Sequence, residues 1–266
     1  MDLRKNFYKN GYFLFKNLFK REEIFNIKKE MISCFNFISR SIYKEDIDII
    51  NFFNKDIQSF LNWANLCQNL TSFFQLSVDE RLINTLKEIG LNIPLHNMKP
   101  NLLFSNKNTA KHDINWKTPS HQDWPSMRGS LNGVTAWVPF IDVTEELGPL
   151  EIASGSHKEG SLDFCSYGSG LIIDQSLDNF NYEPIQMQVG DVLIFNSFTV
   201  HRSGINLTED KIRWSAQFRF DDATESSYIE RKYPRYKKEM RIDTDFDDSF
   251  PSKQTLINLF KKYENK

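Results

Sequence analysis

The first third of the chain carries apolar side chains at helical spacing. Between residues 20 and 42 they recur mostly at three- and four-residue steps, which places them on one face of an amphipathic helix. Two further segments, 57–70 and 78–89, are also predicted to be helical, and the second is followed by Gly90 and Pro94, residues that end helices. Ahead of these helices, a turn at Asn10-Gly11 precedes a short apolar run that predicts a strand. The apolar face of the first helix consists of Ile24, Ile27, Met31, Cys34, Phe35, Ile38 and Ile42.

After Pro94 the pattern changes to short apolar runs separated by Gly, Pro, Asn, Asp and Ser. Such runs are typical of antiparallel strands in a sandwich or barrel. The predicted strands are residues 101–105, 133–140, 150–153, 170–174, 185–189, 191–196 and 213–220.

Helices followed by strands predict an α+β fold. We expect a single domain over residues 1–266, because no repeat, low-complexity tract or long linker interrupts the chain. Its helical part extends to about residue 94, its strand-rich core covers about 95–220, and its extension covers about 221–266. The extension mixes acidic and basic blocks and contains one predicted helix at 252–263.

Composition narrows the class of protein. Of 266 residues, 40% are hydrophobic and 14% aromatic, which is enough for a buried core, and the net charge is −2. A near-neutral charge argues against nucleic-acid binding through a domain-wide basic field. Cys34, Cys67 and Cys165 lack C-x-x-C spacing, so we expect neither disulfides nor a thiolate zinc site, and a reducing cytoplasm fits best. No apolar stretch reaches signal-peptide length or the ~18 residues of a membrane span, so no membrane association is expected.

A candidate metal site begins with His121 and Asp123. On an extended strand, residues two positions apart project from the same face, so both side chains would reach one ion. His201, just past a strand-like run, is the best candidate for a third ligand. Two imidazoles and one carboxylate make the facial triad of non-haem Fe(II) oxygenases, which leaves metal positions open for dioxygen and a bidentate 2-oxo acid.

A His-x-Asp tripeptide is common by itself, and the sequence after His201 makes this one more specific. Arg213 follows His201 by twelve residues, and its guanidinium fork matches a carboxylate such as the distal one of 2-oxoglutarate. Ser215 lies two residues further on the same strand face and could add a hydrogen bond to the same group. The spacing therefore predicts a cosubstrate pocket beside the metal.

Several ordered segments resemble the phytanoyl-CoA dioxygenase family. The resemblance spans about residues 95–220, and a weaker similarity is present at residues 11–14. The segments that carry it are SHQDWP (120–125), GVTAWVPF (133–140), LGPL (147–150), GSHKEG (155–160), GDV (190–192) and HRSGIN (201–206).

The resemblance implies a double-stranded β-helix, or cupin-like jelly roll, with the N-terminal helices packed outside it. It implies binding of Fe(II), 2-oxoglutarate and dioxygen. The iron ligands would be His121, Asp123 and His201.

The resemblance also implies residues that hold the cosubstrate. Arg213 would be the main anchor, and Trp137 and Gln122 would border the same pocket. The interval from His201 to Arg213 is one residue longer than is usual in the family, which leaves the strand register open. Arg219, which alternates onto the same face as Arg213, is the fallback anchor.

The implied reaction is hydroxylation of a small-molecule metabolite with release of succinate and CO₂. Asp123 argues against halogenation, which needs a small residue in its place, whereas desaturation, ring closure and epoxidation stay open. Two alternatives are a non-catalytic metal- or ligand-binding jelly roll and a cupin-like metal isomerase, neither of which needs Arg213. The basic segment 228–241 could meet an anionic substrate, although a solvated surface is the simpler interpretation.

The remaining candidate residues have simpler interpretations. His157 is expected to be structural, and His96 and His112 have no partner pattern. Trp124 and Arg128 are candidates for the mouth of the site. Glu145-Glu146 is interpreted as a solvated turn.

Overall fold

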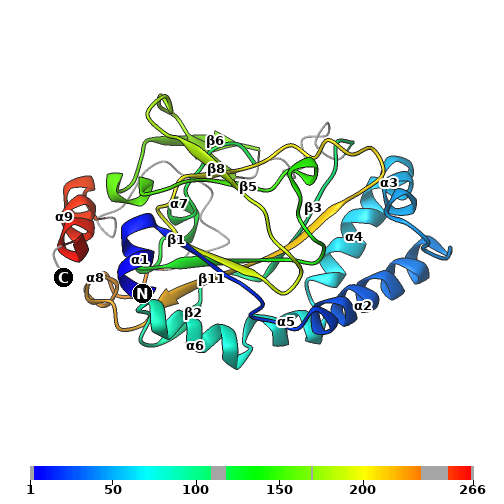
Figure 1. The fold of residues 1–266 in the computed structure, drawn as a ribbon, viewed down its shortest axis with the longest axis horizontal. Helices are drawn as coiled ribbons and strands as arrows, with labels where there is room; N and C mark the ends of the chain where they lie inside the picture. The colour runs from blue at the N-terminus through cyan, green and yellow to red at the C-terminus, as the bar shows by residue number, and fades with distance from the viewer. Residues whose placement is uncertain (1–2, 109–117, 169, 235–250, 265–266) are drawn as a thin grey trace.

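A computed structural model describes residues 3–108, 118–168, 170–234 and 251–264 (Figure 1). The helices before the strand-rich core are α1 (Leu3–Asn10), α2 (Arg21–Ser39), α3 (Asp46–Lys55), α4 (Ile57–Cys67), α5 (Thr71–Ser77) and α6 (Glu80–Ile89). The later helical segments are α7 (Trp124–Met127), η2 (Glu145–Leu147), η3 (Ser156–Glu159), α8 (Ser226–Glu230) and α9 (Lys253–Glu264). Among the described residues, no helix is both long enough and apolar enough to cross a membrane.

The strands form antiparallel sheets. The larger sheet has the order β1-β9-β4-β11-β2, with β3 also paired to β11, and the smaller sheet has the order β10-β5-β8, while β6 and β7 form a separate pair. The strands are β1 (Tyr12–Phe15), β2 (Pro94–His96), β3 (Asn101–Ser105), β4 (Val134–Pro139), β5 (Leu150–Ala153), β6 (Phe164–Tyr167), β7 (Gly170–Ile173), β8 (Tyr182–Ile185), β9 (Val192–Asn196), β10 (His201–Ser203) and β11 (Arg213–Asp222). This is the α+β jelly roll with helices packed outside it that the sequence predicts.

Strand β11 separates the helical side of the larger sheet from the interior. Trp214 and Phe218 face the helices, where their rings lie 5.7 Å from that of Trp63 and 5.4 Å from that of Phe73. The alternate residues face the opposite way because side-chain direction in a strand has a period of two. These inward residues are Arg213, Ser215, Gln217, Arg219 and Asp221, all of them buried. One face of β11 is thus apolar and the other is a row of polar side chains.

The helices form where the sequence supplies both an apolar face and end signals. On α2 four residues of the predicted face are buried at helical spacing: Ile24, Ile27, Met31 and Phe35. The far end of the prediction was wrong, because α2 ends at Ser39 and both Ile38 and Ile42 are exposed. Asp79 accepts a hydrogen bond from the backbone N–H of Arg81 at the start of α6, and Gly90 ends this helix at a φ of 117°. Trp63 of α4 donates to the carbonyl oxygen of Met31 at 2.9 Å, which fixes α4 against α2.

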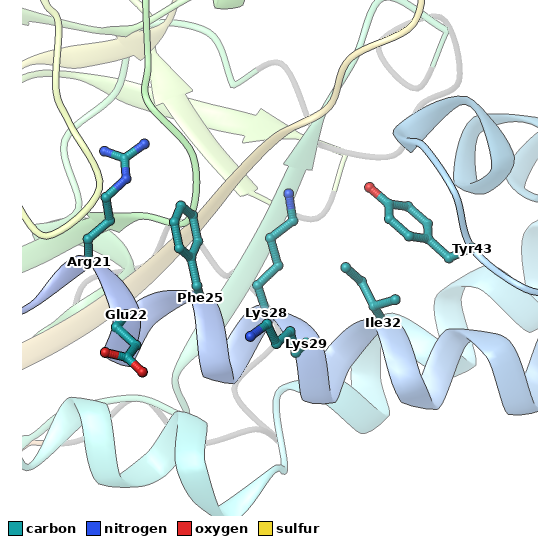
Figure 2. A pocket seen from close by; sticks show the side chains of 7 residues that line it. All are labelled: Arg21, Glu22, Phe25, Lys28, Lys29, Ile32 and Tyr43. Atoms are coloured by element: carbon teal, nitrogen blue, oxygen red, sulfur yellow. The ribbon is translucent and has the colours of Figure 1, made fainter.

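A shallow groove lies along α2 on the outer side of the larger sheet. Figure 2 shows Arg21, Phe25, Lys28 and Tyr43 pointing to the same side of this helix. The Lys28 ammonium lies 4.6 Å from the centre of the Trp214 ring, and burial of its side chain lowers the pKa of Lys28. Because Trp214 is on the helix-facing side of β11, the groove is separated from the inward row of polar residues by the strand itself.

Several elements differ from the sequence prediction. The strand predicted at 185–189 is β8 at Tyr182–Ile185, and Met187 forms only an isolated bridge with Val143. Helices α1, α3 and α5 were not predicted, because segments of seven to ten residues are too short to show a sustained helical period. The predicted C-terminal helix is present as α9, beside α1 (Figure 1). The division of the chain into one domain stays a prediction, and we propose it because helices and larger sheet share one hydrophobic cluster.

We expect the helix–sheet contact to account for much of the stability. Phe60 is fully buried, and its ring lies 5.6 Å from that of Phe104 on β3. Phe60→Ala should lower the free energy of unfolding by about 3–5 kcal/mol, because it leaves a cavity in this contact. Phe37→Ala is the matched control, since Phe37 is 85% exposed, and its effect should stay within about 0.5 kcal/mol. Urea denaturation followed by circular dichroism measures both, and equal effects would contradict the packing described.

Candidate active site

His121, Asp123 and His201 converge inside the jelly roll. Each offers one ligand atom such that all three atoms lie within 4.8 Å of one another. His121 Nε2 is 3.9 Å from Asp123 Oδ1, and the two imidazole centres are 4.1 Å apart. These distances suit one divalent ion held by bonds of about 2 Å, and two imidazoles with one carboxylate fit Fe(II). The geometry therefore brings together the three residues expected to ligate a metal.

Backbone pairing positions the two histidines. His121 and His201 form an isolated antiparallel bridge, with N–H to carbonyl distances of 2.9 and 3.1 Å. The Nδ1 atoms lie 2.8 Å from the Pro119 carbonyl oxygen and 2.9 Å from the Thr199 carbonyl oxygen. A carbonyl only accepts, so each Nδ1 carries the proton and each Nε2 keeps its lone pair for a metal. His201 Nε2 is buried and has no hydrogen-bond partner among the described residues.

Asp123 is positioned differently from the prediction. It was expected on an extended strand with His121, but its φ of −74° and ψ of −28° are helical, and it is the N-cap residue of α7. Pro125, in the first turn of α7, favours this helical turn. The carboxylate still reaches the histidines, and Thr135 of β4 donates to its Oδ2 at 2.5 Å while Arg219 of β11 donates to its Oδ1 at 2.9 Å.

The electrostatics keep all three residues in metal-binding form at neutral pH. Burial lowers the pKa of His201 to about 3, with a further contribution from His121, and burial also lowers the pKa of His121. Burial alone would raise the pKa of Asp123, but the charge of Arg219 holds it below its ordinary value. The imidazoles are thus neutral and the carboxylate is ionised, so a divalent ion need not displace protons from them.

Arg213 is a buried cation with no counterion among the described residues. Its side chain donates to the carbonyl oxygen of Gly148, and its Nη2 lies 3.5 Å from Ser203 Oγ. The guanidinium carbon is 5.9 Å from the centre of the Trp137 ring. Desolvation lowers its pKa to about 10, so it stays charged at neutral pH. Burying a charge without a partner is costly, which makes this guanidinium a candidate site for an anion.

Further polar atoms near Arg213 also lack partners. Ser215 Oγ, Trp137 Nε1 and Arg213 Nε are buried without a hydrogen bond to any residue that the structure describes. Ser215 and Trp137 lie on the inward faces of β11 and β4, whose strands pair directly. Buried polar groups are normally hydrogen-bonded, so an unpaired donor beside an unpaired hydroxyl and a guanidinium fits a carboxylate ligand.

Arg219 and Gln122 occupy other roles than those first considered. Arg219 pairs with Asp123 and donates to Gln217 Oε1 at 2.9 Å, so its guanidinium is directed to the metal ligand. The amide of Gln122 donates to the carbonyl oxygens of Gly160 and Phe198 at 2.8 and 2.6 Å, and it accepts from the N–H of Leu162 at 2.9 Å. Its polar atoms therefore join backbone segments, and its place at the border of a cosubstrate pocket stays a prediction.

The expected mouth residues are not at a mouth. Trp124 is fully buried, with its ring stacked 4.8 Å from that of Phe198, and Arg128 is buried with its Nε bonded to the Pro125 carbonyl oxygen. Trp124 was expected to line the mouth of the site because its packing partner, Phe198, is remote in sequence and cannot be predicted from the residues around Trp124.

The remaining candidate residues either match the expectation or lie outside the described residues. Buried His157 lies 2.8 Å from the Tyr8 carbonyl oxygen, consistent with its structural role, and Glu145 and Glu146 are exposed. His112 and residues 235–241 of the basic segment lie outside the described residues. Thr135 was not among the predicted site residues, although it lies two residues before Trp137 on the same strand face.

The inward row of β11 ends in Asp221, which holds the chain that follows α7. Its carboxylate accepts from the N–H and hydroxyl of Ser130 at 2.9 and 3.2 Å, and from Asn97 Nδ2. Residue 129 is glycine because a Cβ there would collide with this carboxylate. Burial raises the pKa of Asp221 to about 6. The loop that follows α7, the helix capped by Asp123, is thereby fixed to the same strand as Arg213 and Arg219.

The fold and this geometry can now be compared with known proteins. The family model described as Phytanoyl-CoA dioxygenase (PhyH) matches residues 7–215, and the chain belongs to this family.

Among curated relatives, the chain is 32% identical over 109 residues to "Methylphosphonate hydroxylase" of Gimesia maris, covering 39% of this chain and 41% of that protein. It is 26% identical over 162 residues to "2-aminoethylphosphonate dioxygenase" of the uncultured bacterium HF130_AEPn_1, covering 56% of this chain and 60% of that protein. The matched segments thus span less than two thirds of these relatives. The solved epimerase SnoN, in complex with Fe3+, alpha ketoglutarate and nogalamycin RO, shares the fold at a TM-score of 0.59 and 18% identity, covering 84% of this chain and 83% of that one.

We expect Asp221 to give a pH-dependent contribution to stability. Its pKa in the folded state, about 6, lies above the ordinary 3.8, so between these values the folded protein holds a proton that the unfolded chain has lost. This contribution is fully present below the ordinary pKa and is lost as the pH rises through about 6. Relative to Asp221→Asn, the wild-type free energy of unfolding should fall by about 2–3 kcal/mol between about pH 4 and about pH 7.

Urea denaturation at a series of pH values measures this difference. Asp174→Asn, at an exposed side chain, is the control for removing an acidic group in general. A wild-type to Asp221→Asn difference that does not change with pH would show that the carboxyl is ionised throughout.

Proposed function

We propose that the protein is an Fe(II)- and 2-oxoglutarate-dependent dioxygenase that hydroxylates a small molecule and releases succinate and CO₂. The observation that carries this proposal is the convergence of His121, Asp123 and His201 within 4.8 Å. It is supported by membership of the phytanoyl-CoA dioxygenase family and by the names of the relatives, which are hydroxylases and dioxygenases. When bound, the ferrous ion and 2-oxoglutarate supply, with dioxygen, the oxidising power that breaks a substrate C–H bond.

The chain's own residues hold and orient these groups. His121 and His201 present Nε2, and Asp123 presents a carboxylate oxygen, so the ligand set occupies one side of the ion and leaves positions open. We propose that the guanidinium of Arg213 binds the distal carboxylate of 2-oxoglutarate, with Ser215 Oγ and Trp137 Nε1 completing its hydrogen bonds. Arg213 Nε, Ser215 Oγ and Trp137 Nε1 are buried without a hydrogen-bond partner among the described residues, so the carboxylate would supply the acceptor that they lack.

Apolar side chains exclude water from the same interior. They form one cluster between the two sheets, consisting of Trp137, Val143, Leu150, Ile152, Met187, Leu193 and Phe195. The Phe195 ring lies 4.5 Å from that of His201. In such surroundings the attraction between a guanidinium and a carboxylate is stronger than in water, because the local dielectric constant is low.

The substrate that we propose is a small anion. The names of both relatives denote anionic substrates, methylphosphonate and 2-aminoethylphosphonate. A cavity of about 570 Å³ beside β10 is the proposed approach to the site, since Ser203 lines it and also contacts Arg213. Its lining is Thr118, Pro119, Glu151, Tyr167, Arg202, Ser203 and Ile205.

We also propose that the protein works in the cytoplasm. All three cysteines are free in the structure, with Cys67 buried and the other two partly buried. A reducing compartment keeps such thiols unpaired. Purification after fractionation of the cells that contain the protein would test this placement.

Loss of a metal ligand should abolish turnover. We expect Asp123→Ala or His121→Ala to remove iron-dependent succinate release and to weaken binding of divalent metal, because only two protein ligands would remain. Glu145→Ala, at an exposed acidic side chain, is the matched control and should behave as the wild type. Succinate is measured with Fe(II), 2-oxoglutarate and a panel of small phosphonates. Retained turnover by Asp123→Ala would remove this residue from the ligand set.

Loss of the proposed anchor should affect 2-oxoglutarate selectively. Arg213→Gln should raise the 2-oxoglutarate concentration for half-maximal succinate release at least tenfold, which is about 1.4 kcal/mol, because a charged hydrogen-bond partner is lost. The 2-oxoglutarate requirement of Arg213→Lys should lie between those of the wild type and Arg213→Gln, since lysine keeps the positive charge but cannot make the bidentate contact of a guanidinium. Arg21→Gln, whose side chain pairs with Asp142 outside the jelly roll, is the control. An unchanged requirement in Arg213→Gln would exclude this residue as the anchor.

A further inference from the structure

Two buried arginines lie on the inward face of β11, six residues apart. A strand rises about 3.3 Å per residue, so their backbones are separated by about 20 Å along the strand. Arg213 has no counterion among the described residues, whereas Arg219 makes an ion pair with Asp123. The two guanidinium groups therefore lie at different ends of the interior of the jelly roll, and Arg219 lies at the end that contains the proposed metal ligands.

Arg219 and Thr135 hold opposite oxygens of the same carboxylate. They are direct partners in the antiparallel pairing of β11 with β4, so their side chains emerge next to each other on the inward face. Arg219 Nη2 donates to Asp123 Oδ1 at 2.9 Å, and Thr135 Oγ1 donates to Asp123 Oδ2 at 2.5 Å. A carboxylate has about four acceptor positions, so two remain for a metal after both bonds are made.

The arginine is itself held in place. Gln217, two residues earlier on the same face of β11, accepts a hydrogen bond from Arg219 Nη2 at 2.9 Å. Only about a tenth of the Arg219 side chain is exposed, and only 3% of the Asp123 side chain. A buried, charge-assisted bond between two such confined groups restricts the carboxylate far more than a surface ion pair would.

Asp123 needs this support more than the histidines do. His121 and His201 are fixed by their own backbone bridge and by carbonyl oxygens at Nδ1. The Asp123 backbone belongs to the N-terminus of α7, outside the paired strands, and its carboxylate can rotate about two side-chain bonds. Without Arg219 and Thr135, nothing described in the structure would orient its oxygens toward the imidazoles.

We infer that Arg219 is a positioning residue, which with Thr135 holds the Asp123 carboxylate in the orientation that ligates the metal. The inference rests on the proposed function for the presence of a metal, and it does not depend on 2-oxoglutarate, dioxygen or substrate. It assigns Arg219 a role different from that of Arg213, although both lie on one strand face.

The direction of the effect on metal binding tests this role. At a pH at which Asp123 is ionised with or without Arg219, a cation beside a divalent ion only repels it, so an arginine that acted only through its charge would weaken binding, and its removal would tighten binding. A positioning arginine has the opposite effect. Arg219→Met should weaken binding about 10- to 100-fold, because groups that orient metal ligands typically contribute this much to affinity.

The experiment is a calorimetric titration of the full chain with Co(II), without 2-oxoglutarate or substrate, together with the visible absorption spectrum of bound cobalt. Arg219→Met should bind at least tenfold more weakly and change the spectrum, and Arg219→Lys should recover part of the affinity. Arg213→Met is the matched control, since it removes the other buried arginine of the same strand face, and its Co(II) affinity should stay within about threefold of the wild type.

Thr135 supplies a second, independent test should Arg219→Met fail to fold. Thr135→Val removes one donor to Asp123 at nearly constant shape and should also weaken Co(II) binding, whereas Thr135→Ser keeps the hydroxyl and should restore it. Circular dichroism melting curves establish that each variant is folded.

The outcomes separate the inference from the proposed function. Wild-type protein that binds no divalent metal would overturn both. Wild-type binding, with Arg219→Met or its substitute Thr135→Val unchanged or tighter, would overturn the positioning role alone. An equal loss in Arg213→Met would also overturn it, since the effect would then not depend on the contact with Asp123.

Discussion

The alternation of side chains along β11 is the constraint on which the site depends. Its outward residues, such as Trp214 and Phe218, close the contact with the helices, while its inward residues are polar and buried. A shift of one residue in register would exchange these two sets, placing guanidinium groups against Phe and Trp. The hydrophobic contact outside the sheet thus fixes which groups stand inside it, and the stability of the fold and the chemistry of the site share one strand.

Two of the three buried ionisable groups of this row are compensated within the described structure, each in a different way. Arg219 is paired with a carboxylate, and Asp221 is surrounded by hydrogen-bond donors with its pKa raised to about 6. Arg213 has neither solution, since its described contacts are to a carbonyl oxygen, a hydroxyl and an aromatic ring. A folded protein tolerates such a cation when a ligand compensates it, so the absence of a described counterion is more informative here than the presence of the arginine.

Sequence reasoning reached the residues whose positions follow from strand spacing. His201 was chosen because it stands just past a strand-like apolar run, and Arg213 because it follows His201 by twelve residues. The order of helices and strands predicted an α+β fold, and the family resemblance implied the jelly roll. The reasoning was wrong where a local pattern is overridden by a remote partner. The extended geometry assumed for Asp123 yields to the helical turn at Pro125, and Gln122 bonds to carbonyl groups 38 and 76 residues away. No spacing rule within a short motif contains those partners.

Backbone pairing therefore fixes most residues of the site, whereas Asp123 is fixed by hydrogen bonds from other side chains. His121 with His201, and Thr135 with Arg219, are cross-strand partners whose separation is set by the sheets. Asp123 comes from a helix N-terminus, and its backbone lies outside the pairing that orders the others. A facial triad needs its carboxylate as well placed as its imidazoles, since misplacement leaves the metal with two ligands. Because the backbone cannot supply that order for Asp123, it comes from the hydrogen bonds of two neighbouring strands, and one of these bonds requires a second buried cation beside the proposed metal site.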